Sequence, residues 1–110
     1  MINISAGGPF QNATNLAVAS ATAAGLTVVV SAGNDNQAVS LVSPASAATA
    51  ITVGAVDGTD QRAWFSNWGA LVNIFAPGVS VLSAYIGGGP TGSVYMSGTS
   101  MGKSISSPIS

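Results

Sequence analysis

The stretch LTVVVSAGN at residues 26–34 decides the fold class. Its consecutive valines form an unbroken β-branched run, which is typical of a strand that other elements cover on both faces. The preceding residues 12–25, NATNLAVASATAAG, are rich in alanine and predict a helix with an asparagine cap and a closing glycine. Before them, Ile2 and Ile4 alternate with polar residues and predict another strand. A strand, a helix and a strand within about 30 residues form a βαβ unit, so we predict an α/β fold with a parallel sheet.

The chain after this unit predicts more strands. Residues 50–56 (AITVGAV) and 71–78 (LVNIFAPG) have the composition of buried strands. Residues 79–86 (VSVLSAYI) predict a further strand, which a glycine-rich link joins in a hairpin-like way to residues 94–98 (VYMSG). After Met101 we expect no helix, because a glycine, adjacent serines and a proline follow.

The composition limits the classes of protein to consider. The 110 residues allow at most one small domain, with 5% charged residues, 47% hydrophobic residues and a net charge of −1. A small domain needs charge on its large surface, so we expect the interior of something larger; a complete but weakly charged domain is the alternative. The charge balance predicts neither a nucleic-acid partner nor a membrane partner, and no apolar stretch reaches the ~18 unbroken residues of a membrane helix. No cysteine is present, so disulfides and thiolate metal sites are excluded, and the residues leave the compartment open.

Two glycine patterns resemble nucleotide-binding loops by spelling alone. Gly87, Gly89 and Gly92 match G-x-G-x-x-G, but Pro90 interrupts the pattern and no acidic residue follows it. The segment SGTSMGKS at residues 97–104 has a serine where a phosphate-binding loop needs its first glycine. We therefore predict no nucleotide site.

Three short segments carry groups suited to acyl transfer: SAGG (5–8), SAGNDN (31–36) and SGTSM (97–101). Ser100 follows a glycine turn that can expose its hydroxyl, and Asn34 supplies an amide where a buried strand ends. Ligand sites in open α/β sheets gather at such carboxyl ends of strands. Acyl transfer needs this pair, an oxygen nucleophile and donors aimed at the developing oxyanion, although either motif alone is an ordinary turn or loop.

These segments belong to an ordered set of motifs that runs through nearly the whole chain. From Ile2 to Met101 the sequence resembles the C-terminal half of the catalytic domain of subtilisin-like serine proteases, closest to the proteinase K group. The resemblance implies a three-layer, parallel-sheet, subtilisin-like fold, present as a partial domain over residues 1–101. Residues 102–110 depart from the family, and we expect this tail to be disordered. The matching motifs are, in order, NISAGG, VVVSAGNDN, SPAS, ITVGAVDGTDQRAWFSNWG, NIFAPG, VLSAYIGG and MSGTSM.

The resemblance implies a serine endopeptidase that hydrolyses peptide bonds through an acyl-enzyme, with peptides or proteins as substrates and a secreted, extracellular location. It implies that Ser100 is the nucleophile and that Asn34 is the side-chain donor of the oxyanion hole, assisted by the Ser100 N–H. It also implies a strand edge on which an extended substrate lies, and a pocket wall that leaves room for a bulky apolar side chain. The edge consists of Ser5, Ala6 and Gly7, and the wall consists of Ser31, Ala32 and Gly33.

The chain departs from the family in the groups that would activate Ser100. It contains no histidine, and Asp35, Asp57 and Asp60 match family positions other than the triad aspartate. Without a general base, a serine hydroxyl is a poor nucleophile at neutral pH, so we predict that the chain as it stands is inactive. The alternative is a non-catalytic protease relic that binds extended peptides.

A calcium position of the family also differs in this chain. Asn73 stands where proteinase K-like enzymes carry a calcium-binding aspartate. An amide in place of a carboxylate removes charge from a site for a hard cation. We therefore expect a weak or absent calcium site, and no cofactor.

Overall fold

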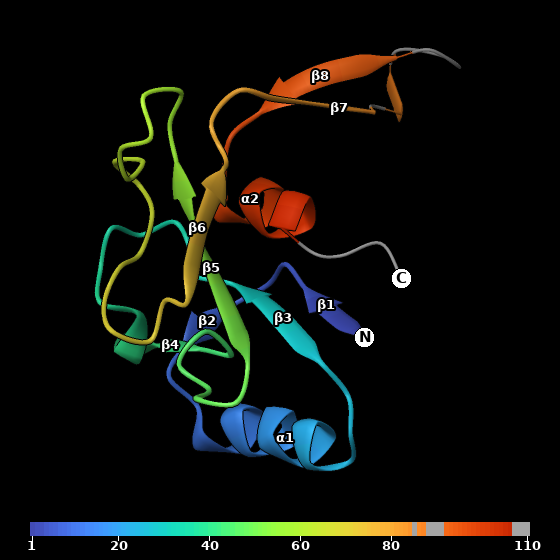
Figure 1. The fold of residues 1–110 in the computed structure, drawn as a ribbon, viewed down its shortest axis with the longest axis vertical. Coiled ribbons are helices and arrows are strands. Elements are labelled where there is room, and N and C mark those ends of the chain that lie inside the picture. The colour runs from blue at the N-terminus through green and yellow to red at the C-terminus, as the bar shows by residue number, and fades with distance from the viewer. Residues whose placement is uncertain (85, 88–91, 107–110) are drawn as a thin grey trace.

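The computed structural model describes residues 1–84, 86–87 and 92–106 (Figure 1). Its centre is a four-stranded parallel sheet in the order β1-β3-β5-β6. The helices α1 (Asn12–Ala23) and α2 (Thr99–Ser106) lie on opposite sides of this sheet, which confirms the predicted α/β fold with a parallel sheet between helices. The strands of the sheet are β1 (Ile2–Ile4), β3 (Val28–Ser31), β5 (Ile51–Val56) and β6 (Ile74–Pro77).

Two small antiparallel pairings accompany the central sheet. One joins β2 (Gly8–Pro9) to β4 (Val42–Ser43), directly after the short 3-10 helix η1 (Val39–Leu41). The other joins β7 (Val81–Ala84) to β8 (Ser93–Met96) and confirms the predicted hairpin. The middle of the glycine-rich link between these two strands, residues 88–91, lies outside the described residues.

The first βαβ unit forms as the sequence predicts, with one shift at the start of α1. β1 pairs with β3 in parallel register, and the chain leaves α1 through Gly25, whose φ of +93° lies in the left-handed region that favours glycine. The prediction of Asn12 as the cap is wrong by one position. Gln11 is the N-cap residue, and its carbonyl accepts the first helical hydrogen bond from the N–H of Asn15 at 3.2 Å.

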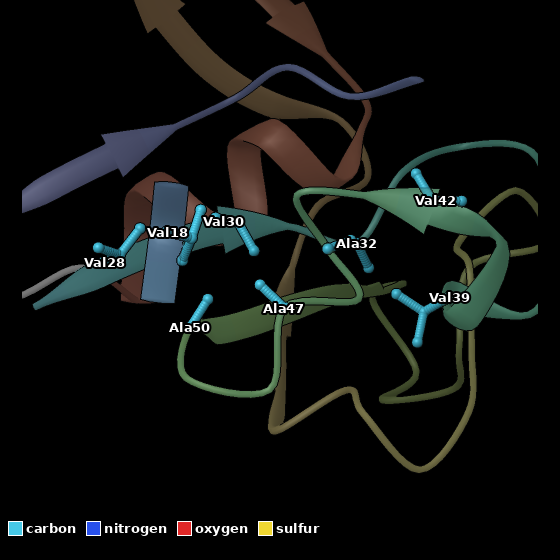
Figure 2. Packing of buried hydrophobic residues seen from close by; sticks show 9 residues of the cluster. Val18, Val28, Val30, Ala32, Val39, Val42, Ala47 and Ala50 are labelled. Carbon is cyan, nitrogen blue, oxygen red and sulfur yellow. The ribbon is translucent and has the colours of Figure 1, made fainter. Parts of the chain in front are cut away.

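The main core is built from valine and alanine side chains (Figure 2). It lies between α1, one face of β3 and the segments that lead to β5. Burial of these side chains stabilises the position of β3, because each Å² of apolar surface removed from water contributes about 25 cal/mol. The opposite face of the sheet has a smaller cluster of Val29, Val53 and Ala76. The main cluster consists of Val18, Val28, Val30, Ala32, Val39, Val42, Ala45, Ala47 and Ala50.

The outer strand β6 is less buried than its sequence predicts. Ile74 is 44% exposed and Phe75 is 42% exposed, whereas Ala76 is buried. The prediction of a buried strand at this place is therefore wrong for Ile74 and Phe75. The reason is topological: in the sheet formed by the described residues, β6 is the last strand, and β5 is its one neighbour.

The expectation that no helix follows Met101 is also wrong, because α2 continues to Ser106. Gly102 explains this helix: a Cβ at that position would lie 3.0 Å from the carbonyl oxygen of Ala76 and 3.2 Å from that of Gly54. The absence of a side chain thus lets α2 pack closely on β5 and β6, and this packing outweighs the low helix propensity of the segment. The prediction of disorder covered residues 102–110: residues 102–106 lie in α2 instead, and residues 107–110 lie outside the described residues. In the part of the chain that the structure describes, neither helix is long and apolar enough to cross a membrane.

Candidate active site

The loop after β3 turns sharply and presents Asn34 at the carboxyl end of the sheet. The N–H of Ala32 still donates to the carbonyl of Val53 at 2.9 Å, and Gly33 then takes a φ of +101°. This left-handed conformation favours glycine, and a Cβ there would also collide with the side-chain amide of Asn67. The SAGN motif therefore requires glycine at position 33 for two reasons: the left-handed backbone conformation and the lack of room for a Cβ.

Asn67 holds this loop on both sides of Asn34. Its side chain is fully buried, and its Oδ1 accepts from the backbone N–H of Asp35 at 3.1 Å and from that of Gln37 at 3.0 Å. Its Nδ2 donates to the carbonyl of Ala32 at 2.8 Å. No sequence pattern predicted a role for Asn67, and the only signal for it was a polar amide between the aromatic residues of the FSNWG segment.

The start of α2 brings Ser100 close to Asn34 through the intervening Thr99. The N–H and the Oγ1 of Thr99 each donate to the Oδ1 of Asn34 at 2.9 Å. The Oγ1 of Thr99 in turn accepts from the N–H of Gly33 at 3.1 Å. Because two donors occupy the Oδ1 of Asn34, its Nδ2 is the group that is left to bind a ligand.

The backbone before Ser100 passes close to the side chain of Asn34. Gly98 has a φ of +158°, and a Cβ there would lie 3.5 Å from the Nδ2 of Asn34. Ser100 is the second residue of α2, so its N–H is among the first four N–H groups of a helix, which have no partner within the helix. The positive end of the helix dipole lies at this point and favours negative charge there.

Most of the site residues predicted from the sequence line one pocket of about 610 Å³. Ala32 is the exception, because it is fully buried and packs in the main core (Figure 2). Its contribution is the carbonyl that accepts from Asn67. The expected site residues that line the pocket are Ser5, Ala6, Gly7, Ser31, Gly33, Asn34 and Ser100, and the others are Gly8, Pro9, Asp35, Gln37, Leu41, Val42 and Thr99.

A second pocket adjoins the first at Ser5 and Ser100, which line both. It measures about 410 Å³, and its other walls come from β7 and α2. Among the described residues that line it, none has an acidic or basic side chain. The remaining lining residues are Val81, Leu82, Ser83, Met101 and Ser104.

Lys103 lies one helical turn after Ser100 but lines neither pocket. It is 4% exposed, and desolvation by burial lowers the pKa of its ammonium group. Its place in α2 is on the side that packs against the sheet, which Thr99 and Gly102 share.

A third, apolar pocket of about 500 Å³ lies between β1 and α1. It shares Ala6, Gly7, Gly8 and Pro9 with the first pocket, but its lining has neither a charged side chain nor Ser100. It therefore adds no catalytic group.

The side chain of Asn73, where the resemblance implies a calcium position, takes part in the hydrogen bonding of the sheet. The Oδ1 of Asn73 accepts from the N–H of Thr52 at 2.7 Å, and its own N–H donates to the Thr52 carbonyl at 2.9 Å. Among the described residues, no group of three or more His, Cys, Asp or Glu side chains is arranged to hold a metal ion. The weak or absent calcium site remains a prediction.

Comparison with known proteins agrees with this geometry. The model of the subtilase family (Peptidase S8) matches residues 1–103. Subtilisin-like protease 2 of Pseudogymnoascus destructans is 54% identical over 101 residues, which cover 92% of this chain and 25% of that protein. Cerevisin of Saccharomyces cerevisiae is 50% identical over 99 residues, which cover 90% of this chain and 15% of that protein.

A solved structure has the same fold over nearly all of the chain. The crystal structure of a cold adapted subtilisin-like serine proteinase matches with a TM-score of 0.85 at 39% sequence identity. The match covers 92% of this chain and 36% of that one. The chain thus spans a quarter or less of the length of the two relatives above, and about a third of this solved chain.

Proposed function

Because the chain belongs to the subtilase family, we propose that it carries the nucleophile-bearing part of a serine endopeptidase site. Ser100 is the nucleophile in this proposal, and Asn34 is the side-chain donor of the oxyanion hole. The observation that supports it is the pair of hydrogen bonds from Thr99 to the Oδ1 of Asn34, which ties the amide to the residue next to Ser100.

The proposed chemistry follows from the positions of these groups. The Oγ of Ser100 attacks the carbonyl carbon of a peptide bond, and the carbonyl oxygen becomes negatively charged. The Nδ2 of Asn34 and the N–H of Ser100 donate to this oxygen, and the positive end of the α2 dipole favours the same charge. The C–N bond then breaks, and the amine leaves with the proton that a general base has taken from the Ser100 hydroxyl. The acyl group stays bonded to the Oγ of Ser100 until water hydrolyses this ester.

The substrate in this proposal is an extended peptide. Ser5, Ala6 and Gly7 are exposed, follow β1 directly and line the pocket that contains Ser100. An exposed backbone edge of this kind can pair with an extended chain by β-augmentation. The secreted location that the resemblance implies belongs to the proposal as well.

The chain lacks the base that this chemistry requires. It contains no histidine, and the single ionisable side chain in the two pockets next to Ser100 is the Asp35 carboxylate. We therefore expect the chain as it stands not to cleave peptides. A fluorophosphonate probe should leave Ser100 unlabelled in the folded chain, with a complete subtilisin as the positive control. Labelling that disappears in Ser100→Ala would contradict the expected inactivity.

A chimera tests the roles of the residues themselves. Residues 1–101 of this chain replace the matching region of Subtilisin-like protease 2 of Pseudogymnoascus destructans, which is 54% identical. The chimera should hydrolyse a peptide substrate, and Ser100→Ala should abolish this activity. Asn34→Leu should lower turnover about 10²–10³-fold with little change in KM, which is the known cost of losing the oxyanion asparagine in a subtilisin.

The second candidate function is a non-catalytic relic that binds extended peptides. Two observations support it: the pocket and the exposed edge at Ser5, Ala6 and Gly7 are present, and the chain contains no histidine. An inactive chimera combined with peptide binding by the chain alone would favour the relic. An active chimera that responds to Ser100→Ala favours the endopeptidase site.

A further inference from the structure

The sequence NAT at residues 12–14 matches the acceptor pattern for N-linked glycans, which is Asn-X-Ser/Thr with X other than proline. So short a pattern also arises by chance, and its place in the fold decides what it means. Asn12 is the first residue of α1, and both Asn12 and Ala13 are exposed. The acceptor amide therefore lies at the surface, where the pattern requires it.

The side chain of Asn12 has no part in holding α1 in place. The N-cap of this helix is Gln11, and the Oγ1 of Thr14 donates to the Oε1 of Gln11 at 3.1 Å. In the part of the chain that the structure describes, the side-chain amide of Asn12 makes no hydrogen bond. A group attached to its Nδ2 would thus break no polar contact of the folded chain.

The chain contains a second match to the pattern, NIS, in a different environment. Asn3 lies in β1, and Ser5 lines both pockets next to Ser100. A glycan on Asn3 would therefore obstruct the edge on which the substrate peptide is proposed to lie. Asn12 lines neither of these pockets, so a glycan there leaves the approach to Ser100 open.

We propose that Asn12 carries an N-linked glycan when the chain passes through a eukaryotic secretory pathway. This inference rests on the proposed function in one respect, the secreted location. The donor is an oligosaccharide held on a lipid pyrophosphate. A bond forms between the Nδ2 of Asn12 and C1 of the first sugar, and the bond between C1 and the pyrophosphate oxygen breaks. The lipid pyrophosphate leaves, and the Nδ2 loses one proton to a base of the transferring enzyme.

Expression in yeast behind a cleavable secretory leader tests the modification of the 110-residue chain. The secreted chain should migrate more slowly on a gel than the unmodified chain, and peptide-N-glycosidase F should remove the difference. In ¹⁸O water this enzyme converts the modified asparagine to a labelled aspartate. Chymotrypsin in ordinary water then cleaves after Phe10 and Leu16, and mass spectrometry of the peptide 11–16 should find the label at position 12.

Variants of the pattern identify the acceptor. Asn12→Gln and Thr14→Val should each abolish the slower migration, because one lacks the acceptor amide and the other lacks the hydroxyl that the pattern requires. Thr14→Ser is the matched control for Thr14→Val, since it keeps the hydroxyl and should keep the glycan. Asn3→Gln should leave the glycan in place. Loss of the glycan in Asn3→Gln, with retention in Asn12→Gln, would overturn the assignment.

Asp57→Asn shows whether the chain reaches the transferring enzyme. This substitution creates the same pattern with Gly58 and Thr59, which are exposed. The Oδ1 of Asp57 accepts from the N–H of Thr59 at 2.8 Å, and asparagine keeps an acceptor at this place. The variant should carry a glycan at each of the two positions. A glycan at position 57 without one at position 12 would show that Asn12 is not an acceptor.

The chimera described above, secreted from yeast, separates this inference from the proposed function. Removal of the glycan at position 12 should leave its kcat/KM unchanged, because Asn12 lies outside the pockets next to Ser100. A chimera that carries the label at position 12 but cleaves no peptide would contradict the proposed function and support this inference. An active chimera without the label would contradict this inference alone.

Discussion

Asn34 and Thr99 are 65 positions apart in the sequence, and two hydrogen bonds of 2.9 Å join them at one oxygen atom. The hydroxyl of Thr99 also accepts from the N–H of Gly33, so a single buried threonine contacts the backbone and the side chain of the loop that carries Asn34. This contact sets the orientation of the Asn34 amide and brings it next to Ser100. Three predictions follow from the residues around it.

Replacing Thr99 with valine should weaken both the fold and the site. Thr99→Val removes the hydroxyl donor to Asn34 and leaves the N–H of Gly33 without its acceptor. Because Thr99 is 1% exposed, we expect a loss of about 1–3 kcal/mol in the free energy of unfolding, measured by urea denaturation.

Two controls accompany this substitution. Thr99→Ser keeps the hydroxyl and should retain the side-chain amide resonance of Asn34 at its original position. Thr49 is exposed, so Thr49→Val should change stability by less than about 0.5 kcal/mol. Equal losses of unfolding free energy in Thr49→Val and Thr99→Val would show that the Thr99 hydroxyl and its hydrogen bonds do not stabilise the fold.

Replacing Gly33 with alanine should strain the loop that carries Asn34. The backbone at Gly33 has a φ of +101°, and the new Cβ would collide with the side-chain amide of Asn67. We expect a loss of about 1–3 kcal/mol in the free energy of unfolding, together with faster amide hydrogen exchange at Asp35 and Gln37, which donate to Asn67.

Gly58→Ala is the matched control for this change. A Cβ at Gly58 would meet no atom within 4 Å, and its φ lies outside the left-handed region. Its stability should stay within about 0.5 kcal/mol of the original chain. A Gly33→Ala variant as stable as Gly58→Ala would contradict the geometry of the loop.

Lys103 should make the stability of the chain rise with pH. Burial lowers the pKa of this lysine below its ordinary value of 10.5, so the folded state disfavours the charged form. The cost of burying the charge is fully present below the folded-state pKa, and it disappears as the pH rises from there to 10.5. Lys103→Met should remove this part of the pH dependence.

The measurement is a series of urea denaturations of both chains between neutral pH and about pH 10. Lys103→Met should be more stable than the original chain at neutral pH, and this advantage should shrink as the pH rises. A Lys103→Met chain that is less stable than the original at neutral pH would mean that the lysine stabilises the fold in its charged form.

Sequence periodicity was sufficient for the parallel part of the fold. The valine run of β3 and the alanine-rich helix before it have strong local signals, and their packing follows from those signals. The glycine turn before Ser100 was also visible in the sequence, whereas Gly33 was expected only as part of the pocket wall, and its left-handed backbone was not predicted.

The remaining features depend on contacts between distant residues, which local patterns do not encode. The segment after Met101 has weak helix propensity, and α2 forms because Gly102 fits against the carbonyls of Ala76 and Gly54. Asn67 acts through three hydrogen bonds to a loop 30 or more positions away. The position of Asp35 in the pocket likewise depends on that loop.

The two outer strands of the sheet have a consequence for the behaviour of the chain in solution. Within the part of the chain that the structure describes, β1 and β6 each have one neighbouring strand, and neither Ile2–Ile4 nor Ile74–Pro77 contains a charged residue. Natural sheets usually protect such borders with lysines or bulges, because unpaired N–H and C=O groups recruit strands from other molecules. The isolated chain should therefore aggregate as its concentration increases, unless another polypeptide covers these borders.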